Sequence, residues 1–94
     1  MKVKVETRGN VVEVYEVIKT ISDSQTLIST IENLRSGSVV LRIYDSFTLP
    51  SSVIGFLLKL KDSGTDVKIE VRDEILYELM DDLNLTTTFS IRKI

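Results

Sequence analysis

Strand-like and helix-like segments alternate along this chain, and that alternation restricts the folds open to it. Val3 and Val5 alternate with polar residues, which predicts a strand over residues 2–7. A second strand is predicted over residues 11–18, after a turn signal at residues 8–10. From there on, predicted helices and strands alternate up to a short last strand. Single helices between strands require right-handed crossovers, so we expect a mostly parallel sheet with an antiparallel first hairpin.

Each of the three predicted helices has a start signal. Ser22 and Gln25 have the spacing of a capping box, in which two side chains satisfy free amides of the first turn. Pro50 precedes the second helix, and Asp73 is placed to cap the third. The remaining strands are expected at residues 39–44, at residues 67–71 and near residues 89–91.

The strand predicted at residues 39–44 (VVLRIY) indicates the centre of the sheet. Side chains of a strand point alternately to the two faces of the sheet, and this stretch has apolar residues on both. That is typical of a central strand covered on both sides. The chain has 94 residues, which is enough for one domain, residues 1–94. The expected fold is therefore a single-domain α/β sandwich in the order β-β-α-β-α-β-α-β, with a mixed, mostly parallel sheet and three helices.

The composition argues against several classes of function. The net charge is −2 and no basic block occurs, so a nucleic-acid surface is not expected. Cysteine and histidine are both absent, which removes thiol chemistry and most general-base and zinc chemistry. Phosphate-binding glycine loops are missing as well. We therefore expect no enzyme activity, no cofactor and no metal.

The first residues, MKVKVETRG, lack the apolar centre of a secretion signal. No apolar run reaches the roughly 18 residues that a membrane-spanning helix needs, so direct insertion into a membrane is not expected. The expected location is the cytoplasm.

A serine pair marks the start of the second helix, in the stretch FTLPSSVIGFLLKL. Ser51 and Ser52 follow the only proline of the chain, Pro50. The simplest interpretation is that Thr48, Ser51 or Ser52 caps the helix and that Pro50 fixes the backbone at its start.

The helix that follows has more apolar residues than one buried face requires. At about 100° per residue, a coherent core stripe forms; it consists of Val53, Phe56, Leu57 and Leu60. Ile54 and Leu58 fall outside this stripe, on the flank that carries Ser51 and Gly55. Either neighbouring elements cover this flank, or it is a patch for a partner.

Taken together, these segments resemble the STAS domain, the family of sulphate transporters and bacterial anti-sigma-factor antagonists. The family signature is a strand, a short loop and then Asp-Ser-Ser/Thr-Gly-Leu-Gly at a helix start. Without gaps it falls on residues 50–55, where Ser51, Ser52 and Gly55 match, while Pro50 and Val53 replace Asp and Gly. Asp45 and Ser46 form a similar pair, but they lie at the strand end, out of this register.

The resemblance implies a regulatory module that switches partners in signal transduction and transcription regulation. In the antagonists a serine kinase phosphorylates the serine after the Asp, which corresponds to Ser51, with Ser52 as the alternative. Only the dephosphorylated form binds the kinase-like anti-sigma factor. The expected partner-binding residues are Ser51, Ser52, Ile54, Gly55 and Leu58.

Two alternatives remain open within this resemblance. One is a divergent member that binds its partner without phosphorylation. The other is a STAS-like subunit of a membrane transport complex, which docks on an ATPase or permease through the same helix.

Overall fold

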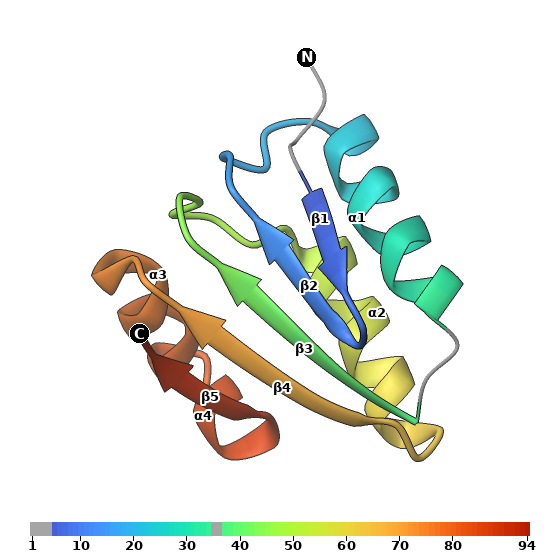
Figure 1. Ribbon diagram of the computed structural model, residues 1–94. Coiled ribbons are helices and arrows are strands. Elements are labelled where there is room, and N and C mark those ends of the chain that lie inside the picture. The colour runs from blue at the N-terminus through green and yellow to red at the C-terminus, as the bar shows by residue number, and fades with distance from the viewer. Residues whose placement is uncertain (1–4, 35–36) are drawn as a thin grey trace.

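Within residues 5–34 and 37–94, which the computed structural model describes, five strands form one sheet whose spatial order follows the sequence (Figure 1). The elements are β1 (Val5–Arg8), β2 (Val11–Val14), α1 (Ile21–Leu34), β3 (Ser38–Ile43), α2 (Ser51–Asp62), β4 (Asp66–Val71), α3 (Glu74–Asp82), α4 (Leu85–Thr88) and β5 (Ser90–Lys93). The β1–β2 pair is antiparallel, and the other three pairs are parallel. The predicted class and order are confirmed, apart from the additional short helix α4. The expected first strand began at residue 2, and residues 2–4 lie outside the described part.

The hydrophobic core lies on one side of the sheet. Each parallel connection steps to the next strand in the same direction, and right-handed crossovers then place the helices on the same face. Figure 1 shows α2 lying behind the strands. The strand side chains buried beneath the helices are those of one phase: Val12, Val14, Val39, Leu41, Ile43, Val67, Ile69 and Val71.

β3 is central, as predicted, because it pairs with both β2 and β4. The expectation that both of its faces are buried is wrong. Leu41 and Ile43 are buried towards the helices, whereas Val40 and Arg42 of the opposite phase are only half-buried. No described helix covers that second face, because the connections run over the first one.

A reciprocal cap starts α1, two residues before the predicted one. The Asp23 amide donates to Thr20 Oγ1 at 3.0 Å. In return, Asp23 Oδ2 accepts from the amides of Lys19 at 2.9 Å and Thr20 at 3.1 Å. This is the capping-box arrangement with Asp in the place of Glu. The predicted box of Ser22 and Gln25 is therefore wrong, whereas the predicted cap of α3 is confirmed by the Asp73 side chain.

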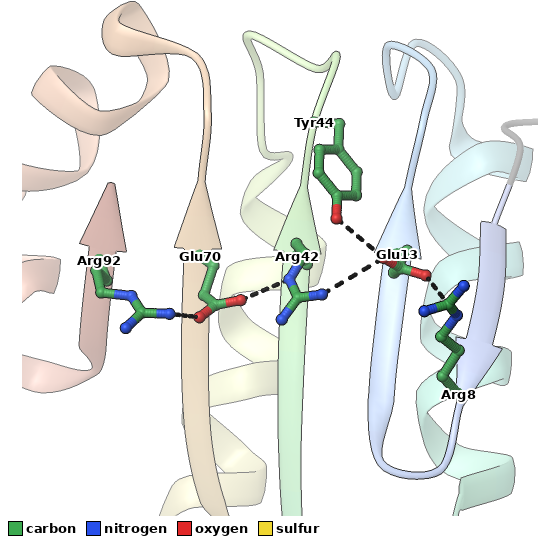
Figure 2. A network of polar contacts seen from close by, with 6 residues as sticks. All are labelled: Arg8, Glu13, Arg42, Tyr44, Glu70 and Arg92. Atoms are coloured by element: carbon green, nitrogen blue, oxygen red, sulfur yellow. Dashed lines mark hydrogen bonds and ion pairs between the residues drawn. The ribbon is translucent and has the colours of Figure 1, made fainter. Parts of the chain in front are cut away.

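The open face of the sheet carries a row of alternating charges, one from each strand (Figure 2). Arg8 Nε lies 3.6 Å from Glu13 Oε1, and Arg42 approaches Glu13 Oε2 at 3.5 Å. Arg42 Nε also donates to Glu70 Oε1 at 2.6 Å, and Arg92 donates to the second oxygen of Glu70. We call these five residues the charge ladder.

The two carboxylates of the charge ladder are removed from solvent. Glu13 is 3% exposed and Glu70 8% exposed, so each needs charged or hydrogen-bonding partners. The Tyr44 hydroxyl donates to Glu13 at 3.0 Å. The hydrogen bond from Arg42 is the main reason why the pKa of Glu70 is lowered. The ladder therefore links neighbouring strands by ion pairs across the face that no described helix covers.

The lowered pKa of Glu70 predicts a loss of stability in acid. A group whose pKa is lower in the folded chain contributes fully above its unfolded value, which is about 4.3 for Glu. That contribution disappears as the pH falls through the folded value. We expect the free energy of unfolding of Glu70→Gln to depend less steeply on pH below about 4.3 than that of the wild type. Urea denaturation at a series of pH values measures this, and parallel acid limbs would contradict it.

Candidate functional site

The start of α2 lies at the carboxyl edge of the parallel strands, beside the start of α1. β2 ends at Val14 rather than at residue 18 as predicted, so the chain leaves the sheet where its alternation breaks. Residues 15–20 then form a loop that leads into α1, and residues 44–50 form the loop from β3 into α2. Both loops emerge from neighbouring strands at one edge, where the sites of open α/β sheets are usually found.

Two hydrogen bonds clamp these two loops together, and a third braces the second loop internally. The Ile18 amide donates to Ser46 Oγ at 3.2 Å, and Thr48 Oγ1 donates to the Ile18 carbonyl at 3.0 Å. Ser46 Oγ also donates to the Thr48 carbonyl at 2.8 Å. Ser46 is fully buried, so these partners replace the water that its hydroxyl would otherwise bind. The clamp holds the loop from which Pro50 and α2 begin.

α2 begins at Ser51, as predicted, and its cap is Pro50. The Pro50 carbonyl accepts from the amides of Val53 at 3.0 Å and Ile54 at 3.1 Å. Pro50 supplies no side-chain cap, and Ser51 and Ser52 occupy the first turn with exposed side chains. The interpretation that Thr48, Ser51 or Ser52 caps the helix is therefore wrong, and the Thr48 hydroxyl bonds to the Ile18 carbonyl instead.

The electrostatics of this helix start differ from those of its neighbours. The first turns of α1 and α3 contain Asp23 and Glu74, whereas the first turn of α2 contains no acidic residue. The positive end of the helix dipole and the amides of the first turn are thus not offset by a nearby carboxylate. Chemically, this position can accept an anionic group on Ser51.

Ile54 and Leu58 are half-buried and pack against the core. Leu60, which the sequence placed in the core stripe, is also only half-buried; on the opposite flank of α2 it borders a small cavity together with Ile31 and Leu34 of α1. That flank therefore faces α1, and Ile54 and Leu58 lie on the side of α2 turned away from it. Their flank is neither fully covered nor fully exposed.

Two exposed apolar residues lie at the same edge of the sheet but were not among the predicted partner-binding residues. Phe47 is 51% exposed within the clamped loop, and Ile21, the first residue of α1, is 78% exposed. Gly55 is exposed on α2, and a Cβ there would meet no other atom within 4 Å, so packing does not require glycine. Sequence reasoning missed Phe47 and Ile21, although Phe47 stands out as a large apolar residue in a predicted loop.

A hollow of about 450 Å³ lies at the same edge, and its walls include Tyr15, Val17, Lys19 and Asp45. The Tyr15 ring stacks on Tyr44 with centroids 5.0 Å apart. Within residues 5–34 and 37–94, no cluster of acidic side chains is arranged to hold a metal ion. No helix in those same ranges has the length and apolarity to cross a bilayer.

Comparison with known proteins returns no match to a protein-family model, a curated protein or a solved structure. The structure establishes an α/β fold with a five-stranded mixed sheet. The likeness to STAS domains accordingly rests on the sequence alone, on the order of its segments and the motif at residues 50–55.

The loop clamp predicts that Ser46 matters for stability although it is a single hydroxyl. Ser46→Ala leaves the buried Ile18 amide without its acceptor, so we expect the free energy of unfolding to fall by about 1–3 kcal/mol. The control is Ser63→Ala, which removes an exposed hydroxyl bonded to the Leu60 carbonyl at 2.8 Å and should change stability by about 0.5 kcal/mol or less. Urea denaturation compares the two, and equal losses would show that the clamp contributes no more than a surface serine.

Proposed function

We propose that this chain is a cytoplasmic regulatory module that binds a protein partner through the start of α2, in the manner of an anti-sigma-factor antagonist. The observation that carries the proposal is the state of Ser51. It is exposed, it is the first residue of α2, and its helix turn has neither a side-chain cap nor an acidic residue. A kinase could reach this hydroxyl without opening the fold.

A phosphate on Ser51 would act as a switch through two opposite effects. It carries about −1.5 to −2 charges, which the amides of the first turn can accommodate while the chain is free. Against an apolar partner the same charge would have to be desolvated, which is costly. Phosphorylation is therefore compatible with the fold and unfavourable for the complex.

The proposed partner surface combines this switch with nearby apolar groups. Ser51, Ser52 and Gly55 supply exposed, small contacts, and the half-buried Ile54 and Leu58 flank them. Phe47 and Ile21 add exposed apolar area at the same edge. Aromatic and aliphatic anchors beside a polar switch are typical of interfaces whose binding energy is concentrated in a few residues. The partner class indicated by the resemblance is a kinase-like anti-sigma factor.

Affinity capture from native lysate, with the recovered proteins identified by mass spectrometry, tests the proposal. Ser51→Ala is expected to retain a serine-kinase-like protein, as the wild type does, and Ser51→Asp is expected to lose it. Capture of that protein by all three chains would support the module that binds without phosphorylation. Capture of a transport ATPase or permease instead would favour the transport-complex subunit and overturn the antagonist.

If this surface binds the partner, substitutions in it should lower partner affinity much more than they lower the free energy of unfolding. Leu57 is fully buried, so Leu57→Ala should lower the free energy of unfolding by about 2–5 kcal/mol. Leu58 is half-buried, so Leu58→Ala should cost only about 1 kcal/mol while weakening partner affinity about tenfold or more. Ser51→Asp should leave the fold intact, because a negative charge is favourable in the first turn of a helix.

Denaturant midpoints and partner affinities of these three variants are measured together. If Leu58→Ala destabilises the chain as much as Leu57→Ala, then Leu58 is a core residue and does not belong to the binding surface. If Leu58→Ala weakens binding only as far as it unfolds the protein, the same conclusion holds.

A further inference from the structure

α3 presents aliphatic side chains to solvent as well as to the core. Leu76 and Met80 are buried against the sheet. Ile75, Leu79 and Leu83 are 68%, 44% and 54% exposed. Three large aliphatic groups at these exposures contribute little to the core of the domain, which leaves their surface available for another contact.

The exposed three form one stripe. Ile75 and Leu79 are four residues apart, and Leu83 follows four residues later as the C-terminal cap residue. At about 100° per residue, positions four apart lie one turn above each other and drift by about 40°. The stripe therefore runs along the whole length of α3, beside the buried pair. This spacing matches the anchors through which helices dock on one another.

Acidic residues accompany the stripe. The segment from the cap of α3 to its end contains five of them and no Lys or Arg: Asp73, Glu74, Glu78, Asp81 and Asp82. By helical position, Glu74, Glu78 and Asp82 lie on the side of the stripe that faces away from Leu76 and Met80. We call the stripe together with these acids the α3 face.

Only part of this charge has a role in the fold. Asp73 caps the helix by accepting from the Leu76 amide at 3.0 Å, and Glu74 pairs with Lys93 at 2.9 Å. Within the described ranges, Glu78 and Asp82 form no hydrogen bond or ion pair.

The acids at the end of α3 work against the helix itself. Asp81 and Asp82 occupy its last turn, where the negative end of the helix dipole disfavours carboxylates, and the last turn holds no basic residue. Asp81 accepts a hydrogen bond from Thr86 Oγ1 at 2.8 Å, whereas Asp82 has no such partner among the described residues, so its charge is unfavourable for the isolated domain. A cation brought by a partner would relieve it.

The charge of the α3 face decides among its possible occupants. A second copy docking through α3 would bring two acidic helices together, and like charges at close range cost affinity. Anionic lipid headgroups and nucleic acid are repelled for the same reason. A segment with aliphatic anchors and flanking Lys or Arg satisfies both the stripe and the acids.

We propose that the α3 face docks a basic amphipathic helix of a partner protein. The aliphatic side chains of that helix pack on Ile75, Leu79 and Leu83, and its Lys or Arg side chains lie against Glu78 and Asp82. The α3 face lies on a different helix from Ser51, so the proposal stands whether or not Ser51 is a switch.

Two synthetic peptides of about 18 residues test the proposal, each with Leu along one face. The first peptide carries Lys on its other face, and the matched control carries Glu there. We expect the Lys peptide to bind the full chain, with amide chemical shifts changing chiefly at residues 73–84. The affinity should fall as salt rises, since the charges are at the surface. Absence of binding at about 1 mM Lys peptide, equal binding of the Glu peptide, or shifts centred elsewhere would overturn the proposal.

Variants separate the two components of the α3 face. Leu79→Ser should weaken binding of the Lys peptide by about tenfold, and Asp82→Lys should weaken it and flatten its salt dependence. Ile21→Ser removes an aliphatic side chain from α1 that is even more exposed than Leu79, 78% against 44%, and it should leave the affinity for the Lys peptide unchanged. The proposal fails if Ile21→Ser weakens binding as much as Leu79→Ser. It also fails if the wild type dimerises and Leu79→Ser makes it a monomer, or if the wild type binds vesicles of anionic lipid through this helix.

Discussion

The connections between the parallel strands run over the same face of the sheet, and this constraint shapes both sides of the molecule. On the covered side, residues of one strand phase and the helices share a single core. On the other side, the sheet faces solvent, so its side chains must tolerate water and can also link neighbouring strands. The charge ladder does both, with Arg42 joining the buried carboxylates of Glu13 and Glu70. Leaving either carboxylate buried without its arginine would be costly.

The same layering brings the two loops of the candidate site together. Because β2 and β3 are parallel neighbours, the loops that follow them emerge side by side, and the buried Ser46 hydroxyl connects them. α2 therefore starts from a fixed position, with Ser51 at the surface. Under the proposed function, a phosphate on Ser51 would alter the charge of this edge without altering the fold, which is the property a reversible binding module needs.

Local patterns in the sequence were sufficient to predict the order of elements, the start of α2 at Ser51 and the cap at Asp73. They were not sufficient where the outcome depends on residues far apart in the chain. Ser46 bonds to Ile18, 28 residues away, and the charge ladder joins all five strands of the sheet. The apolar residues of α3 show a related limit, because helical spacing alone does not say whether Ile75 faces the core or solvent.

Amide hydrogen exchange on the complex with the partner that the wild-type chain captures tests the central claim most directly. The account predicts that binding slows exchange chiefly at residues 46–58, around the start of α2, and much less on the strands of the open face. Phosphorylation of Ser51 should abolish this protection without changing exchange in the core strands. Protection centred on the charge ladder, or protection that survives phosphorylation unchanged, would contradict the assignment of this edge as a switched partner surface.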